Sequence, residues 1–495
     1  MSKALFLSNV GNRDLGKDKT PLFDNKPNKK SDELKEYCRE EYKKITGEDL
    51  KADELFSFTK ELYSSGVYRK LDLEPIIIKY QIKKILELHD SIDVVLFGTL
   101  QNGGYKTDAY YSASIIEYII KKEFGDKINS IKVYAINDNP SDYSLMFEYY
   151  KKTLNNFKND KDYESIYLGI TGGTPALSFG LIICGALKWE LKAKVLYQSL
   201  FKNEPTYMDI GYKLFNILKN REYITLYDKH LYELCAEIGK DYNLIPDWKY
   251  HYLLGLHYKE LFDFKRALEE FDKAYKCDNV NFKDKKEIQK EINSIKDFEK
   301  IDINNIVIKD NINLYAKLID LLIENAKIKW ENGEYVDFIG RIFRLKEALL
   351  RMIIEKEFNI STNPKNVEEN GKKIKRWLEF EEFLDNNPKI YDYLEKETDW
   401  NGRKEPNNRV LDWILGYMVN KGKKEWKKYA KIYGFSKNLE KLSELRNESI
   451  LAHGFKGISK TDIVNRYDKN NNNEMKIISD LDNIKEIISE LIDNK

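Results

Sequence analysis

In the N-terminal part of the chain, hydrophobic and polar positions repeat with two different periods. Apolar runs rich in β-branched residues occur at Ala4–Ser8, Val94–Gly98, Ile131–Ile136, Ser165–Ile170 and Ala193–Leu200. Segments with helical periodicity lie between the later runs, at Ala109–Lys122, Ser141–Phe157 and Ala176–Leu187. Apolar strands that alternate with helices of this length are typical of a parallel sheet covered on both faces. The pattern therefore predicts an N-terminal α/β domain.

The rest of the chain has a helical pattern. A helical insertion, about Asp32 to His89, separates the first two predicted strands, and beyond Tyr212 helical periodicity continues to the end. Within Tyr250–Cys277, small and aromatic residues have the spacing of a tetratricopeptide-type helical hairpin, namely Leu254, Gly255, Tyr258, Ala267, Phe271 and Ala274. One such hairpin cannot bury its own face, so we expect a connector that packs on a neighbour.

These patterns divide the chain, which at 495 residues is too long for one ordinary core, into three expected domains. An α/β domain takes residues 1–215, an all-α connector takes 216–305, and a second all-α domain takes 306–495. Inside the last domain, Ser361–Lys373 and Asn470–Asn473 have the composition of surface loops.

Composition narrows the class of protein. Lysine and arginine total 83 against 82 aspartates and glutamates, so the net charge of +1 indicates a local RNA contact at most. The four cysteines lie far apart, which favours reduced thiols in a cytoplasmic protein. The longest apolar stretch, about Leu177 to Trp189, is shorter than the roughly 18 residues of a membrane span. We therefore expect a cytoplasmic protein with no membrane contact.

Candidate catalytic residues stand near the C-terminal end, at Arg446, Asn447 and His453. They follow a helical repeat of leucines, and Arg446 and His453 are nearly two turns apart, so we expect both side chains on one helix face. RNA cleavage by its own 2′-hydroxyl needs no metal, because histidine can move the proton and arginine can stabilise the charged phosphate. Two copies across a two-fold axis would bring both groups to one phosphate. Taken alone, the pair Arg446 and His453 is equally compatible with a surface arginine and a histidine that caps a helix or lies in the core.

Three loops at the carboxyl ends of predicted strands have the composition of a phosphate-binding site. They contain Asn9, Gly11, Asn12 and Arg13 in the first, Thr99, Gln101 and Asn102 in the second, and Thr171, Gly172, Gly173 and Thr174 in the third. Bare N–H groups at a helix N-terminus bind anions, and ligands of parallel sheets bind at this edge. None of the loops has a Walker A or GxGxxG pattern, which disfavours a nucleoside triphosphate or a dinucleotide. Each loop alone is also a common structural loop.

Arg446-Asn447 followed by His453 resembles the Arg-x4–6-His motif of HEPN ribonucleases, and Phe338–Arg351 is similar to an early HEPN helix. The resemblance implies that Arg446 stabilises the phosphorane-like charge and that His453 takes part in proton transfer. Asn447 would orient the phosphate or the arginine. Glu347 would either hold Arg446 in place or form an exposed ion pair.

The loop from Thr171 to Pro175 is similar to the ligand loop of CARF domains. The whole chain thus resembles the CARF–HEPN ribonucleases of type III CRISPR systems, the Csm/Csx ancillary group. The resemblance implies a Rossmann-like CARF domain, an all-α connector and an all-α HEPN domain. It implies a homodimer, activated by a cyclic oligoadenylate, that cuts single-stranded RNA without a metal or other cofactor and leaves 2′,3′-cyclic phosphate ends. Some members also cleave the activator, a reaction for which no residue is assigned here.

Two further functions stay open. One is a sensor of the same messenger with a non-RNase effector, which would need a metal cluster of carboxylates. The other is a non-enzymatic switch whose helical half binds a partner. Measuring RNA cleavage in EDTA separates both from the metal-independent ribonuclease.

A basic segment just before the motif combines lysines with aromatic rings. Its members are Lys421, Lys423, Lys424, Lys427, Lys428 and Lys431, with Trp426, Tyr429 and Tyr433. Basic groups beside stacking rings suit single-stranded RNA. A solvated helix with its aromatics in the core has the same pattern.

Overall fold

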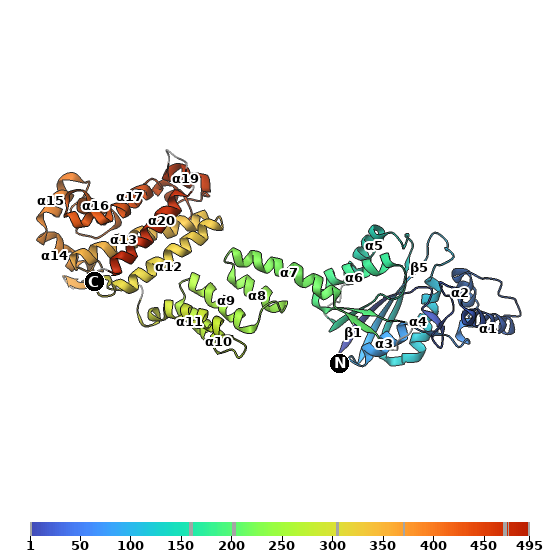
Figure 1. The fold of residues 1–495 in the computed structure, drawn as a ribbon. Coiled ribbons are helices and arrows are strands. Elements are labelled where there is room, and N and C mark those ends of the chain that lie inside the picture. The colour runs from blue at the N-terminus through green and yellow to red at the C-terminus, as the bar shows by residue number, and fades with distance from the viewer. Residues whose placement is uncertain are drawn as a thin grey trace. The chain divides into compact units, whose positions relative to one another are not determined.

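The computed structural model describes residues 2–157, 162–199, 204–302, 306–369, 372–468, 473 and 475–493. The chain divides into two compact units, residues 1–221 and 222–495 (Figure 1). The helix α7 (Ile210–Asp228) contains the boundary between them.

Within the described residues, one six-stranded sheet forms the centre of the first unit. Its order is β6-β5-β1-β7-β8-β9, where the strands are β6 (Ile128–Ile136), β5 (Ser91–Thr99), β1 (Lys3–Asn9), β7 (Ser165–Gly169), β8 (Ala193–Tyr197) and β9 (Thr206–Met208). All neighbours pair in parallel except β9, which is antiparallel to β8. The five predicted strands and the parallel α/β fold are confirmed. The strand order reverses between β1 and β7, where such sheets bind ligands.

Helices cover both faces of the sheet, because successive side chains of a strand point to opposite faces. Ala4 and Phe6 of β1 belong to a core shared with α3 (Ile78–Leu86) and α4 (Tyr110–Phe124). Leu5 and Leu7 belong to a core shared with α5 (Tyr143–Asn155) and α6 (Pro175–Trp189). Because β1 contributes apolar side chains to both cores, these four residues form a continuous hydrophobic run in the sequence.

The predicted helical insertion between the first two strands is only partly helical. It holds α1 (Lys29–Thr46), α2 (Leu55–Ser64) and α3, but also β4 (Glu74–Pro75). That strand joins β2 (Leu15–Lys17) and β3 (Thr20–Pro21) in a small antiparallel sheet. These strands have two or three residues each, too short to give a period in the sequence.

The second unit begins with a helical region that contains the predicted hairpin. The helices are α8 (Tyr232–Asp241), α9 (Asp247–Glu260), α10 (Phe264–Lys276) and α11 (Phe282–Ile295). A Cβ on Gly255 of α9 would lie 2.5 Å from the ring of Phe271 on α10, so the two helices need glycine to approach this closely. The predicted hairpin is confirmed. The hydrophobic core of the hairpin extends to Leu314 and Leu318, which belong to the same compact unit. The division into a separate connector domain stays a prediction.

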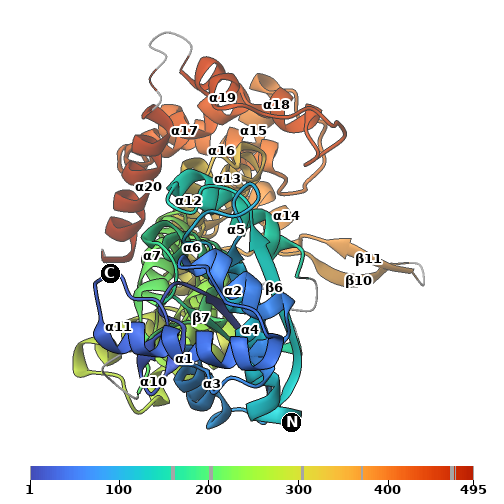
Figure 2. The same cartoon turned by 90° about the vertical axis from the view of Figure 1, so that its right-hand side faces the viewer.

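The remaining helices surround one large core. They are α12 (Ile312–Glu331), α13 (Tyr335–Phe358), α14 (Leu378–Asn386), α15 (Pro388–Glu397), α16 (Asn408–Lys421), α17 (Ala430–Glu440), α18 (Ser443–Glu448), α19 (Lys460–Tyr467) and α20 (Lys476–Asp493). A hairpin of β10 (Lys365–Glu369) and β11 (Lys372–Arg376) interrupts this helical part (Figure 2).

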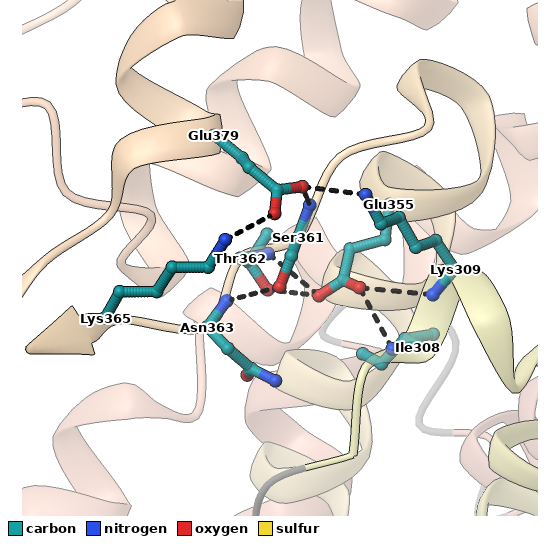
Figure 3. Close-up of polar contacts among 8 residues, drawn as sticks. All are labelled: Ile308, Lys309, Glu355, Ser361, Thr362, Asn363, Lys365 and Glu379. Carbon is teal, nitrogen blue, oxygen red and sulfur yellow. Dashed lines mark hydrogen bonds and ion pairs between the residues drawn. The ribbon is translucent and has the colours of Figure 1, made fainter.

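The predicted surface loop Ser361–Lys373 is therefore wrong. Thr362 is fully buried, and both its N–H and its hydroxyl donate to the carboxylate of Glu355, at 3.0 and 2.5 Å (Figure 3). Glu355 also accepts from the N–H of Ile308 at 3.1 Å, and burial raises the pKa of this carboxyl. One carboxylate thus ties two segments to α13. The other predicted loop, Asn470–Asn473, lies outside the described residues except for its last residue.

Candidate functional site

A cavity of about 450 Å³ lies in the first unit, at the carboxyl ends of the strands. Nine of the predicted ligand residues line it: Gly11, Asn12, Arg13, Thr99, Gln101, Thr171, Gly172, Gly173 and Thr174. The three predicted loops therefore meet at one place, at the switch point between β1 and β7. Residues that sequence reasoning did not select also line it, namely Val10, Asp14, Asn25, Ile77, Thr107, Ala109, Pro140, Leu177, Tyr197, Gln198 and Ser199.

The first and third loops pack against each other through glycine. A Cβ on Gly11 would lie 2.4 Å from the backbone nitrogen of Gly173. A Cβ on Gly172 would lie 2.4 Å from the carbonyl oxygen of Asn9, and Gly173 has a φ of 79°. These glycines are required by the contact between the loops and by the left-handed turn.

The threonines of the third loop already have partners. Thr171 Oγ1 accepts a hydrogen bond from the N–H of Gln198 at 2.7 Å. Thr174 caps α6 by accepting from the N–H of Leu177 at 3.3 Å, and its hydroxyl donates to the carbonyl of Pro140. The hydroxyl hydrogen of Thr174 is thus used inside the protein. Pro175 begins α6 and has no N–H, and the N–H of Leu177 donates to Thr174, so the backbone N–H that remains for an anion in the first turn of this helix is that of Ala176.

Two predicted ligand residues do not line the cavity. Asn9 is fully buried, and its side-chain oxygen accepts from the hydroxyl of Tyr150. Its amide nitrogen has no hydrogen-bond partner. Asn102 stands in the loop after β5 with a φ of 27°, a conformation that asparagine tolerates better than most residues. Asn9 therefore has a structural role in the buried layer below the loops, and Asn102 allows the left-handed conformation of the loop after β5.

Asp14 is a lining residue that the sequence did not single out. Its side chain is buried, and Oδ2 accepts from the N–H of Gly11 at 2.6 Å while Oδ1 has no hydrogen-bond partner. Burial raises the pKa of this carboxyl to about 7. Its neighbour Arg13 pairs with Asp24 at 2.7 Å. In the sequence, Asn12-Arg13-Asp14 looks like an exposed polar turn, and nothing in it signals a buried acid.

The motif residues in the second unit do not share one helix. α18 ends at Glu448, so the prediction that Arg446 and His453 lie on one helix face is wrong. The hydroxyl of the buried Ser449 donates to the carbonyl of Arg446 at 2.7 Å and takes the place of a helical hydrogen bond. The chain then turns back, and the N–H of His453 donates to the carbonyl of Asn447 at 3.3 Å.

Arg446 is positioned by its neighbours. Its guanidinium lies over the ring of Phe343, 4.9 Å from the ring centroid, and donates to the side-chain oxygen of Asn447 at 2.9 Å. Glu347 pairs instead with Arg344 and Arg351, at 2.8 and 3.4 Å. Of the two roles considered for Glu347, the ion pair away from Arg446 is therefore the observed one.

In the basic segment before the motif, two of the three aromatic rings lie in the core, whereas Asn447 and His453 of the motif itself are exposed. Trp426 and Tyr429 are buried, and both donate to the carboxylate of Glu357. A ring held in this way cannot stack on a base. The interpretation of the segment as a solvated helix with core aromatics is confirmed for these two rings.

Among the described residues, no three side chains of histidine, cysteine, aspartate and glutamate gather as metal ligands. No helix in the same residues combines the length and the apolar character needed to cross a membrane.

Comparison with known proteins identifies the helical part. Residues 307–494 match the family model of the Cas_Csm6 HEPN domain. The C-terminal part of the second unit is a Csm6-type HEPN domain. Arg446, Asn447 and His453 all lie within this HEPN domain. A solved structure, Enterococcus italicus Csm6 bound to cyclic hexa-2′-fluoro-hexa-dAMP, is similar over 99% of this chain and 95% of that chain, with 12% identity and a TM-score of 0.49. No curated protein sequence matches the chain.

Proposed function

We propose that the chain is a ribonuclease of type III CRISPR defence that a cyclic oligoadenylate activates and that cuts single-stranded RNA without a metal ion. The observation that carries this proposal is the match of residues 307–494 to the Csm6 HEPN domain, with Arg446 and His453 inside it. The first unit supplies the sensor. Its cavity at the β1/β7 switch point, lined by the loops that follow β1, β5 and β7, suits a ligand with phosphates.

The motif residues have distinct roles in this proposal. The 2′-hydroxyl of the ribose attacks the adjacent phosphate, His453 moves a proton, and Arg446 stabilises the negative charge that develops. Asn447 holds the guanidinium through the bond to its side-chain oxygen and holds His453 through its backbone carbonyl. The products would end in a 2′,3′-cyclic phosphate.

A homodimer would complete the site. Ile450 and Phe455 lie on either side of His453 in the sequence, and their side chains are 70% and 95% exposed. Together with the exposed Leu451, they give this turn three apolar side chains that a contact with a second copy would bury. A second copy that covers them would place two motifs together across a two-fold axis. Light scattering should then report a dimer.

The activator would bind in the cavity of the first unit, the role that we assign to a CARF domain. Cyclic adenylates of different ring size, added separately to the purified protein with a fluorescent RNA reporter, test both halves of the proposal. Strong cleavage with one ring size and none without activator is the expected result. Constitutive cleavage, or none with any ring, would contradict it. Chromatography of the activator after the same incubation measures whether the protein also cleaves it.

A further inference from the structure

A second cavity lies in the second unit, beside the motif residues. Its volume is about 420 Å³, within the roughly 300–1,000 Å³ typical of small-molecule sites. Leu318, Ile319 and Leu322 of α12 give it aliphatic walls, and Phe262 adds a ring from the turn between α9 and α10. Nothing in the proposed cleavage step uses this cavity.

The cavity adjoins the motif turn through α13. Gly340 lines the cavity, and a Cβ at this position would lie 3.5 Å from both Cδ atoms of Leu451. Leu451 belongs to the turn between Asn447 and His453. Phe343 lies less than one helical turn further along α13, and the guanidinium of Arg446 lies over its ring. One helix therefore borders both the cavity and the motif.

Two arginines of α13 line the same cavity. Arg341 is held in a fixed direction, because its Nε donates to the side-chain oxygen of Asn325 at 3.0 Å and its Nη1 pairs with Asp337 at 2.9 Å. Asn325 is buried and donates in turn to the carbonyl of Glu260 at 3.1 Å. Arg344 is 58% exposed beside Glu347, so its guanidinium can also reach a ligand phosphate.

The aromatic wall has an unusual backbone. Phe262 has a φ of 59°, a left-handed conformation that is rare for a bulky residue. Two hydrogen bonds close this turn, from the N–H of Phe262 to the carbonyl of Lys259 and from the N–H of Asp263 to the carbonyl of Tyr258, at 3.1 and 2.9 Å. Strained conformations that the surrounding structure enforces cluster at ligand sites. Here the strain presents a ring to the cavity.

We propose that this cavity binds a nucleobase of the RNA substrate close to the cleaved bond, and that it sets the base preference of the enzyme. The inference rests on the proposed ribonuclease function and deepens it. Single-stranded RNA is recognised by bases that leave the stack and lie against aromatic and aliphatic side chains, while arginines hold the adjacent phosphates. The walls supply the first contact, and Arg341 and Arg344 supply the second.

The test uses the full chain, activated by cyclic oligoadenylate, with a library of short RNAs that vary one base on each side of a single cleavable bond. Arg344→Ala should raise KM on the order of tenfold, because a charge-assisted bond to phosphate is lost, with a smaller change in kcat. Leu322→Trp should fill the cavity and flatten the base preference at one position. Lys317→Ala on α12 and Leu234→Trp on α8 change the same kinds of residue outside the cavity lining and serve as controls.

The outcomes separate this inference from the proposed function. If the unmodified protein cleaves no RNA with any activator, the ribonuclease proposal fails. If it cleaves RNA, and both cavity variants keep its KM and its base preference, the base subsite is wrong while the ribonuclease stands. Equal activator affinity and equal melting temperature in all variants show that the changes act on RNA and not on folding. A shift in base preference confined to Leu322→Trp and Arg344→Ala supports the subsite.

Discussion

The backbone N–H of His453 donates to the carbonyl of Asn447 at 3.3 Å, so the histidine lies at the end of the helix that carries the arginine and not on its face. The short turn between them replaces the helical spacing that the sequence suggests. It folds His453 back onto Asn447, the residue that follows Arg446. The geometry of this turn is therefore as important to the proposed site as the residue types.

Replacing either chemical group should abolish RNA cleavage. We expect Arg446→Ala and His453→Ala each to lower the rate by roughly 10²–10⁴-fold, the range for a positioned proton transfer or charge. Messenger binding and the melting temperature should not change, since Asn447 and His453 are exposed and Arg446 lies at the surface of α18. Lys441→Ala is the control for loss of a nearby charge. A variant with most of the original rate would remove that residue from the site.

The hydroxyl of Ser449 should be required for the turn. Ser449→Ala removes the hydroxyl bond to the carbonyl of Arg446, which still accepts from the N–H of Ser449 at 3.3 Å, and leaves the N–H of Leu451 without its partner. The loss of these part-buried bonds should cost about 0.5–1.5 kcal/mol each. We expect a loss of cleavage of tenfold or more with only a modest fall in melting temperature. Ser443→Ala, at the start of the same helix, should have neither effect. Equal rates in the two variants would show that the turn does not depend on this hydroxyl.

Asp14 should make the stability of the first unit depend on pH. Its pKa, about 7 in the folded unit against 3.8 as the ordinary value, means that the folded state holds the proton more tightly than the unfolded chain. Its contribution is fully present below about pH 4 and is lost as the pH rises to 7. Asp14→Asn removes this titration. Relative to the variant, the unmodified protein should lose melting temperature between pH 4 and 7, and a constant difference would contradict the buried acid.

The turn at Gly173 should control activation and not catalysis. A valine there would meet the side chain of Leu177, at 2.8 Å from the new Cβ, in a left-handed backbone. We expect Gly173→Val to need about 10²-fold more activator, equivalent to about 2.7 kcal/mol of ligand contact, and to reach the unmodified protein's rate once the activator is saturating. Gly47→Val has the same φ of 79° at the end of α1 but no atom within 4 Å of the new Cβ. If both variants respond alike, the loop has no special role in binding.

The sequence predicts the features that depend on a repeated pattern or on a single turn. The sheet could be predicted from apolar runs such as that of β1, and the place of the cavity could be predicted from the glycines of the third loop. Both features follow from local chemistry. Asp14 was missed because its carboxylate packs against Gly172, which comes from a loop far away in the sequence. The end of α18 was missed because leucine periodicity continues up to Leu445, while the hydroxyl of Ser449 decides where the helix stops.

The same reasoning explains the basic segment. Lysines that alternate with aromatics fit an RNA surface or a helix above a core, and no local pattern separates the two. Trp426 and Tyr429 can be buried because Glu357, far away in the sequence, accepts hydrogen bonds from the polar group of each ring. Pairing partners of this kind become visible only in the folded structure.

RNA cleavage in EDTA, followed by mass spectrometry of the product ends, tests the central claim most directly. The chain should cleave a single-stranded RNA in the presence of cyclic oligoadenylate and EDTA and should leave 2′,3′-cyclic phosphate ends, because the 2′-hydroxyl of the RNA is the nucleophile. His453→Ala protein under the same conditions should leave the RNA intact. Cleavage that stops in EDTA, or products with only 5′-phosphate ends, would contradict the account and indicate water activated by a metal ion.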